Sequence, residues 1–277
     1  MTDTILSGLY IYPIKSAAGI GLKTAQVQPR GLEFDRRWMV VDAKQKFMTQ
    51  RKLPKMALIQ VAIAATTLQV SAPNMPTLEV PLQQPETEEN HLTVEVWGDR
   101  CLALSTGAES QAWFSQFLGQ DCQLVYMPDV SNRPTEHGKF GERQQVSFAD
   151  AFPFLLISEA SLADLNYRLT ERQVAPIAMD RFRPNLVVSG CDAFAEDTWK
   201  NIQIGSQRLT VAKACSRCVI PSINQSTGTK EKEPIPTLLT YRHWDKNIWF
   251  GQNLIHTDTV NPVSGMLMVG DRLSHLP

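Results

Sequence analysis

Two cysteines separated by two residues form the motif of this sequence with the clearest chemical potential. Cys215 and Cys218 enclose Ser216 and Arg217, follow a strand-like run and precede the apolar residues 219–221. Such a pair can bind zinc, form a redox-active dithiol or pack in a core. Alternatively, one thiolate can bind a soft transition metal while Ser216 and Arg217 hold an anionic group of the ligand that carries the metal.

The neighbouring sequence disfavours some of these four alternatives but excludes none of them. A structural zinc site needs a second ligand pair at a fixed spacing, and the five histidines and the other cysteines are scattered. A thioredoxin-like dithiol begins a helix, whereas Val-Ile-Pro at 219–221 resists helix formation. A Ser-Arg dipeptide is also a poor choice for an apolar core. On these residues alone the four alternatives stay open.

Bulk properties limit the class of protein. The 277 residues, 43% of them hydrophobic, suffice for one large or two small domains with a real core. A net charge of -1 gives no reason to expect nucleic acid or an anionic membrane as the main partner. The amino terminus lacks the features of a secretory signal, and no apolar stretch is long enough for a membrane span. We therefore expect a cytoplasmic protein without a membrane span, and the five cysteines argue against a disulfide framework.

Short strand-like runs dominate the elements that must position this motif. In the first hundred residues, alternating or β-branched runs predict strands at 9–14, 36–42, 56–64, 67–72, 77–82 and 92–99. In the remainder, similar runs predict strands at 122–127, 182–190, 201–205, 207–213, 218–223, 247–255 and 265–273. Helical spacing predicts helices over 109–118, ending at Gly119, and from a cap at Ser158 onwards. Residues 127–145 lack periodicity and suit a linker or mobile loop.

Several of these segments resemble one known family. Residues 148–166, 181–190, 213–221 and 250–254 are similar in content and order to the MOSC domain, the molybdenum-cofactor sulfurase C-terminal domain. Residues 9–16, 31–42, 49–59 and 94–99 resemble the β-barrel domain that precedes MOSC in one subgroup. That subgroup includes the mitochondrial amidoxime reducing component and bacterial reductases of N-hydroxylated bases.

The resemblance implies a fold and a function. It implies a mainly β protein with some α, in which an N-terminal β-barrel-like domain (1–127) packs on a MOSC domain (128–277). It implies a molybdenum-dependent oxidoreductase that carries Mo-molybdopterin and reduces N-hydroxylated compounds such as amidoximes and hydroxylaminopurines. Electrons would come from a separate donor protein, because the sequence has no flavin or nicotinamide fingerprint and no cysteine-rich ferredoxin segment. A cofactor carrier or sulfur-transfer module without redox turnover is the alternative.

The resemblance also implies roles for individual residues. In the family, the position of Cys218 is the protein ligand to molybdenum, and Cys215 is only its neighbour. Asp150 matches an acidic position beside the metal, where a carboxylate can accept a hydrogen bond or pass a proton. The matching residues that would bind the pterin and its phosphate are Lys15, Arg36, Arg183, Asn185, Ser216 and Arg217.

Overall fold

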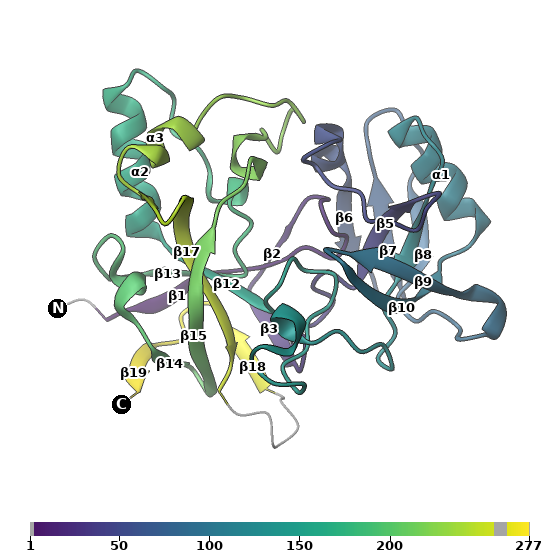
Figure 1. Cartoon of the computed structure of the whole chain (residues 1–277), viewed down its shortest axis with the longest axis horizontal. Helices are drawn as coiled ribbons and strands as arrows, with labels where there is room; N and C mark the ends of the chain where they lie inside the picture. The colour runs from purple at the N-terminus through teal and green to yellow at the C-terminus, as the bar shows by residue number, and fades with distance from the viewer. Residues whose placement is uncertain (1–2, 258–264, 277) are drawn as a thin grey trace.

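Residues 3–257 and 265–276 are described by a computed structural model, which arranges them in two lobes (Figure 1). The α-helices of this part of the chain are α1 (Ala108–Leu118), α2 (Glu159–Glu171) and α3 (Ile235–Leu239). Helices α2 and α3 lie in one lobe and α1 lies in the other. Strands make up most of the remaining regular structure, which confirms the predicted class, mainly β with some α.

A nine-stranded sheet forms the larger lobe. Its strands follow the order β19-β14-β15-β17-β12-β13-β1-β2, and β16 pairs with β17 outside this path. Their bounds are β1 (Ile5–Ile11), β2 (Ile20–Leu22), β12 (Phe154–Ser158), β13 (Leu186–Ser189), β14 (Asn201–Ile204), β15 (Gln207–Ser216), β16 (His243–Trp244), β17 (Asn247–His256) and β19 (Leu273–Leu276).

The first strands of the chain belong to this lobe as well. Strand β1 pairs antiparallel with β13, and β3 (Thr24–Gln28) pairs with both β4 (Gly31–Leu32) and β18 (Gly265–Met268). Leu6, Val27, Leu186 and Leu267 share one buried hydrophobic core. Strands from both ends of the chain are therefore interleaved, and the division at residues 127 and 128 stays a prediction.

Two smaller sheets and α1 build the second lobe. One sheet has the order β5-β11-β10-β9 and the other β6-β7-β8. Alternate side chains of β7, Leu68 and Val70, are buried against Trp113 and Phe114 of α1, because a strand presents every second residue to the same face. The bounds are β5 (Trp38–Asp42), β6 (Gln60–Ile63), β7 (Thr67–Ser71), β8 (Leu78–Pro81), β9 (His91–Val96), β10 (Asp99–Ser105) and β11 (Cys122–Tyr126).

The two helices predicted from local signals are confirmed. Helix α1 ends at Leu118 and is capped by Gly119, whose φ of 74° is a left-handed conformation that glycine adopts without strain. Helix α2 begins after Ser158, whose side-chain oxygen accepts a hydrogen bond from the Ser161 amide at 3.0 Å. Leu165 and Leu169 bury the inner face of α2. Helix α1 therefore ends, and helix α2 begins, where the sequence indicates.

The strand predicted over 218–223 is wrong. The ladder ends at β15, and the next backbone bond runs from the Arg217 amide to the Ile248 carbonyl at 2.7 Å. Ile220–Ser222 form a single 3-10 turn instead. Pro221 has no amide to donate, so this apolar run could not continue a ladder of hydrogen bonds. Cys218 consequently lies in a loop.

The aperiodic segment 127–145 is a loop, as predicted, but parts of it are buried. Arg133 is 2% exposed and Thr135 is fully buried. Thr135 begins a 3-10 turn that extends over Thr135–Gly138. Buried polar backbone needs partners, and this segment finds them partly in arginine side chains. The segment is therefore packed against the rest of the protein.

We expect His256, at the end of β17, to make the folded protein less stable at acidic pH. The ring is 3% exposed and packs edge-on against Phe154. Burial lowers the pKa of His256 to about 4, although hydrogen bonds with the backbone of Gln28 and Pro29 oppose this shift. The unfolded chain binds the same proton with a pKa near 6.5, so protons favour unfolding as the pH falls from about 6.5 towards 4.

We expect this residue to lower the free energy of unfolding by about 2 kcal/mol between roughly pH 7.5 and 4.5. Urea titrations at both pH values measure this loss. His256→Gln should show a smaller loss, because glutamine can keep a donor to the backbone and does not titrate. Equal losses in both proteins would contradict the assignment.

Candidate functional site

A cavity of about 730 Å³ is lined by residues from both halves of the chain. Lys15, Arg36 and Trp97 come from the first hundred residues, and Arg183 and Cys218 come from the last hundred. The cavity brings together every candidate site residue of the sequence analysis, namely Lys15, Arg36, Asp150, Arg183, Asn185, Ser216, Arg217 and Cys218. Their shared position is a structural result, whereas the role of each residue stays a prediction.

The two cysteines of the motif differ in their surroundings. Cys218 is exposed, whereas Cys215 is half-buried at the end of β15 and accepts a hydrogen bond from Arg217 Nη1 at 3.1 Å. The register of β15 against β17 shifts between Ala214 and Ser216. Such irregularities redirect side chains, often near functional sites. The exposed thiol of Cys218 thus lies at the cavity wall.

This geometry bears on the four alternatives for the motif. The interpretation that both cysteines pack in the core is excluded for Cys218, because its side chain is exposed. The motif does not begin an α-helix, so the helix dipole that activates thioredoxin-like dithiols is missing. Within residues 3–257 and 265–276, no three His, Cys, Asp or Glu side chains form a group that could hold a metal ion. A metal that uses Cys218 would have to bring its other ligands with it.

Cationic side chains outnumber carboxylates around the cavity. Eight lysines and arginines line it against three carboxylates, although the whole chain has a net charge of -1. A concave site with one sign of charge concentrates ligands of the opposite charge. The cations are Lys15, Arg36, Arg51, Arg133, Lys139, Arg183, Lys213 and Arg217, and the carboxylates are Asp99, Glu136 and Asp150. The cavity is therefore suited to an anionic ligand.

Arg36 and Arg183 both contact the ring of Tyr12. Their guanidinium groups lie 4.3 and 4.2 Å from the centre of the Tyr12 ring. Arg36 pairs with Asp35 at 2.6 Å and donates to Asn185 Oδ1 at 3.1 Å. Arg183 donates to the Ala17 carbonyl at 2.7 Å and has no carboxylate within ion-pair distance in the described part of the chain. Burial lowers the pKa of Arg183 to about 10, and the neighbouring Arg36 contributes.

Arg217 is a second guanidinium without a carboxylate partner among the described residues. Its Nη2 donates to the Phe182 carbonyl at 2.9 Å, and its buried Nε has no hydrogen-bond partner. A buried donor without a partner is costly. Arg183 and Arg217 can both offer charge to a ligand without breaking an ion pair. The donors present therefore fit a phosphate-bearing ligand.

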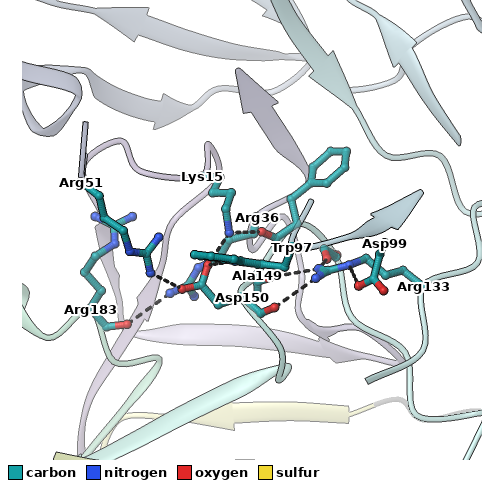
Figure 2. Close-up of polar contacts among 11 residues, drawn as sticks. Lys15, Arg36, Arg51, Trp97, Asp99, Arg133, Ala149, Asp150 and Arg183 are labelled. Carbon is teal, nitrogen blue, oxygen red and sulfur yellow. Dashed lines mark hydrogen bonds and ion pairs between the residues drawn. The ribbon is translucent and has the colours of Figure 1, made fainter. Parts of the chain in front are cut away.

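Asp150 is the centre of a hydrogen-bonded network in the cavity (Figure 2). Its Oδ1 accepts from Lys15 Nζ at 2.5 Å and from Trp97 Nε1 at 3.0 Å, and its Oδ2 accepts from Arg51 at 2.9 Å. Partial desolvation in the cavity would by itself raise the pKa of Asp150, but Lys15 and Arg51 outweigh it and hold this pKa well below its usual range. Asp150 is therefore ionised at neutral pH.

Lys15 holds the proton of this pair less tightly than an ordinary lysine. Its ammonium group is buried and also donates to the Phe148 carbonyl at 2.7 Å. Burial lowers the pKa of Lys15 to about 8, even though Asp150 favours the charged form. The cavity therefore places a proton with a pKa near neutrality beside a permanent carboxylate.

Sequence comparisons give this geometry a family. The family model of the MOSC N-terminal beta barrel domain matches residues 4–121, and that of the MOSC domain matches residues 143–274. Mitochondrial amidoxime-reducing component 1 of Mus musculus is 37% identical over 246 residues, which cover 86% of this chain and 71% of that protein. The chain belongs to the MOSC family.

Two further relatives show how far the similarity of this MOSC protein extends. Mitochondrial amidoxime-reducing component 1 of Homo sapiens is 34% identical over 95% of this chain and 80% of that protein. The molybdenum cofactor sulfurase of Danio rerio is 32% identical over 97% of this chain, but over only 34% of its own length. Among the helices described here, none has both the length and the apolar character of a membrane span.

Strained backbone gathers at the cavity of this MOSC protein. Five of the twelve described non-glycine residues with positive φ line the cavity. Such conformations cost of order 1 kcal/mol each and persist where the surrounding structure holds them in place. These five residues are two arginines, one glutamate and two neutral residues, namely Arg36, Arg183, Glu136, Ser16 and Trp97.

Three cavity residues that contact Asp150 were not singled out by the sequence. Arg51 pairs with Asp150, lies 4.7 Å from the centre of the Trp97 ring and is within hydrogen-bonding range of the Cys218 thiol. Trp97 and Arg133 complete the same wall. Arg51 and Trp97 lie in segments that carry the family resemblance, which is the only signal that could have found them. Arg133 lies in the aperiodic loop, where periodicity gives no information.

Proposed function

We propose that this MOSC protein binds a molybdenum–pterin cofactor through Cys218 and reduces N-hydroxylated compounds such as amidoximes and hydroxylaminopurines. The observation that carries the proposal is the exposed thiol of Cys218 in a cavity with an excess of cations. Two relatives named amidoxime-reducing components, at 34 and 37% identity, support the reaction class.

The cavity residues divide into two groups under this proposal. Arg36, Arg183, Asn185 and Arg217, together with Ser216, would hold the pterin and its phosphate, because a doubly charged anion needs several donors. Cys218 would be the single protein ligand to the metal. When bound, the cofactor supplies the two-electron couple that removes oxygen from an N–O bond.

The reaction consumes two electrons and two protons and converts an N–OH group into an N–H group and water. Lys15, which the family resemblance places among the cofactor-binding residues, has a pKa near 8, so it is protonated at neutral pH and could also release a proton at moderate cost. Asp150 stays ionised, so its part is to accept hydrogen bonds and to orient Lys15 and Arg51. Electrons come from a separate donor protein.

The test is turnover by protein loaded with the cofactor and supplied with electrons from a chemical reductant. Benzamidoxime should be converted to benzamidine, with the product quantified by chromatography. Cofactor-free protein under the same conditions is the control. Loaded, reduced protein that leaves benzamidoxime and a hydroxylaminopurine unchanged would contradict the proposal.

One observation favours a second function. The similarity to the molybdenum cofactor sulfurase covers 97% of this chain and a third of that protein. A cofactor carrier or sulfur-transfer module would use the same thiol and the same cations without turnover. Loaded protein that is inactive on both substrates, but transfers its cofactor to a cofactor-free enzyme, would support this second function.

A further inference from the structure

Arg133 occupies the wall of the cavity that holds Asp150, although it comes from the aperiodic loop 127–145. The side chain is 2% exposed. Nη1 donates to the Ser147 and Ala149 carbonyls at 2.6 Å each, Nη2 donates to the Asp150 carbonyl at 3.0 Å, and Nε donates to Asp99 Oδ2 at 2.9 Å (Figure 2). One guanidinium thus contacts two separate segments of the chain.

The first segment is the turn that carries Asp150. Three of the carbonyls at positions 147 to 150 point towards the same guanidinium. Each such bond involves a charged donor and is stronger than a bond between neutral groups. With its carbonyls held in this direction, the turn has little freedom to rotate. The side chain of Asp150 is therefore fixed towards the cavity, where it is 52% exposed.

The second segment carries Trp97. Asp99, the carboxylate partner of Arg133, follows Trp97 by two residues. The indole of Trp97 is 44% exposed, lines the cavity and donates to Asp150 Oδ1. Trp97 also has a positive φ of 55°, a conformation that needs support from its surroundings. Arg133 therefore joins the two segments whose side chains meet at Asp150.

We propose that Arg133 is a positioning residue that fixes Asp150 and Trp97 relative to each other in the cavity wall. Lys15 and Arg51 both bond to the same carboxylate, so their positions depend on Arg133 through Asp150. The kinetic consequence of this inference rests on the proposed function. The geometric consequence does not, because it can be measured in protein without cofactor.

Arg30, in the turn between β3 and β4, offers a matched control because its side chain contacts the loop that contains Arg133. Its guanidinium donates to the Asp129 carbonyl at 3.1 Å, to the Val146 carbonyl at 3.3 Å and also to the Ser131 carbonyl. Arg30 does not line the cavity. Loss of Arg30 should loosen the loop at a comparable number of carbonyls without touching the turn of Asp150. A difference between the two arginines therefore separates positioning from simple anchoring of the loop.

The experiment compares Arg133→Gln and Arg133→Lys with Arg30→Gln and Arg30→Lys. The first readout is the fluorescence of Trp97 in cofactor-free protein, obtained by subtracting the spectrum of the same protein with Trp97→Phe. We expect both Arg133 variants to shift this emission and to increase its quenching by acrylamide, whereas the Arg30 variants leave it unchanged. Arg133→Lys should not restore the wild-type Trp97 emission, because an ammonium group cannot donate to all four acceptors that the planar guanidinium group contacts.

The second readout is the kinetics of loaded protein with benzamidoxime. We expect the Arg133 variants to lower kcat by about 10- to 100-fold with a smaller change in KM, since small misplacements of reacting groups have effects of this size. The Arg30 variants should retain wild-type kcat. If Arg133→Gln does not fold, Asp99→Asn weakens the same link from the Trp97 side and should give the same shift in emission.

The outcomes are distinguishable. Unchanged Trp97 emission in folded Arg133 variants, or equal changes in the Arg30 and Arg133 variants, would overturn the positioning role. Wild-type protein that is inactive on benzamidoxime would contradict the proposed function, while the fluorescence comparison would still decide the role of Arg133.

Discussion

Protein with Cys218→Ser, expressed in cells that make the cofactor, is expected to contain at least about tenfold less molybdenum than wild-type protein. The reason is that the described residues offer no group of three potential ligands that could hold the metal in place of this thiol. Serine keeps the size of the side chain but is a far poorer ligand for a soft metal. Elemental analysis of the purified proteins measures the effect, and activity should fall in parallel.

Cys215→Ser is the matched control for this prediction. Cys215 belongs to the same motif, but it is half-buried and bonded to Arg217. Its replacement should leave most of the molybdenum in place. Full molybdenum content in Cys218→Ser, or its loss in Cys215→Ser alone, would show that the assigned ligand is wrong.

The elements that could be predicted from the sequence are those with local causes. Gly119 ends α1 because of its own backbone freedom, and Ser158 begins α2 through a bond to a residue three positions away. Alternation of apolar residues predicts β7 for a similarly local reason. The prediction of a strand at 218–223 was wrong because it rested on apolar character alone. In the described part of the chain the segment has no neighbouring strand to pair with, and Pro221 has no amide hydrogen to donate.

The site could be predicted only through family resemblance. Lys15 and Asp150 are 135 residues apart in the chain, and no spacing in the sequence places them 2.5 Å from each other. Their contact depends on how the turn after Phe148 packs against the segment that follows β1. Arg133 shows the limit of the sequence more clearly, because a buried arginine in an aperiodic loop looks like any solvated charge until its acceptors are known.

The interleaving of strands was equally beyond local signals. Strand β1 overlaps a predicted strand, but its partner β13 comes from the second half of the chain. Strand β3 was not predicted, and it pairs with β18 near the carboxyl end of the chain. Pairing over such distances is decided by burial of Leu6 and Val27 in a shared core. The same interleaving brings Arg36, which follows β4, next to Asn185 and Arg183.

Arg183→Met is the second substitution with a large expected effect. A guanidinium that pairs with a phosphate contributes about 1.5–3 kcal/mol, so its loss should weaken retention of the cofactor by about 10- to 100-fold. The cofactor-free protein should respond differently. Arg183 is a buried charge without an ion-pair partner in the described residues, and burial together with Arg36 already lowers its pKa to about 10. Methionine removes this unfavourable charge and keeps much of the apolar contact with Tyr12.

We therefore expect Arg183→Met to lose cofactor while the urea midpoint of its cofactor-free form is unchanged or higher. Arg181→Met is the matched control and should behave in the opposite way. Arg181 is similarly buried, but it pairs with Glu231 at 2.6 Å and does not line the cavity. Its loss should lower the free energy of unfolding by about 1–3 kcal/mol and spare cofactor content. Pterin and molybdenum analysis beside urea titration of both variants gives the test. If both variants lost cofactor in proportion to their loss of stability, Arg183 would be a structural residue, and the anion site would have to be built from the other cations of the cavity.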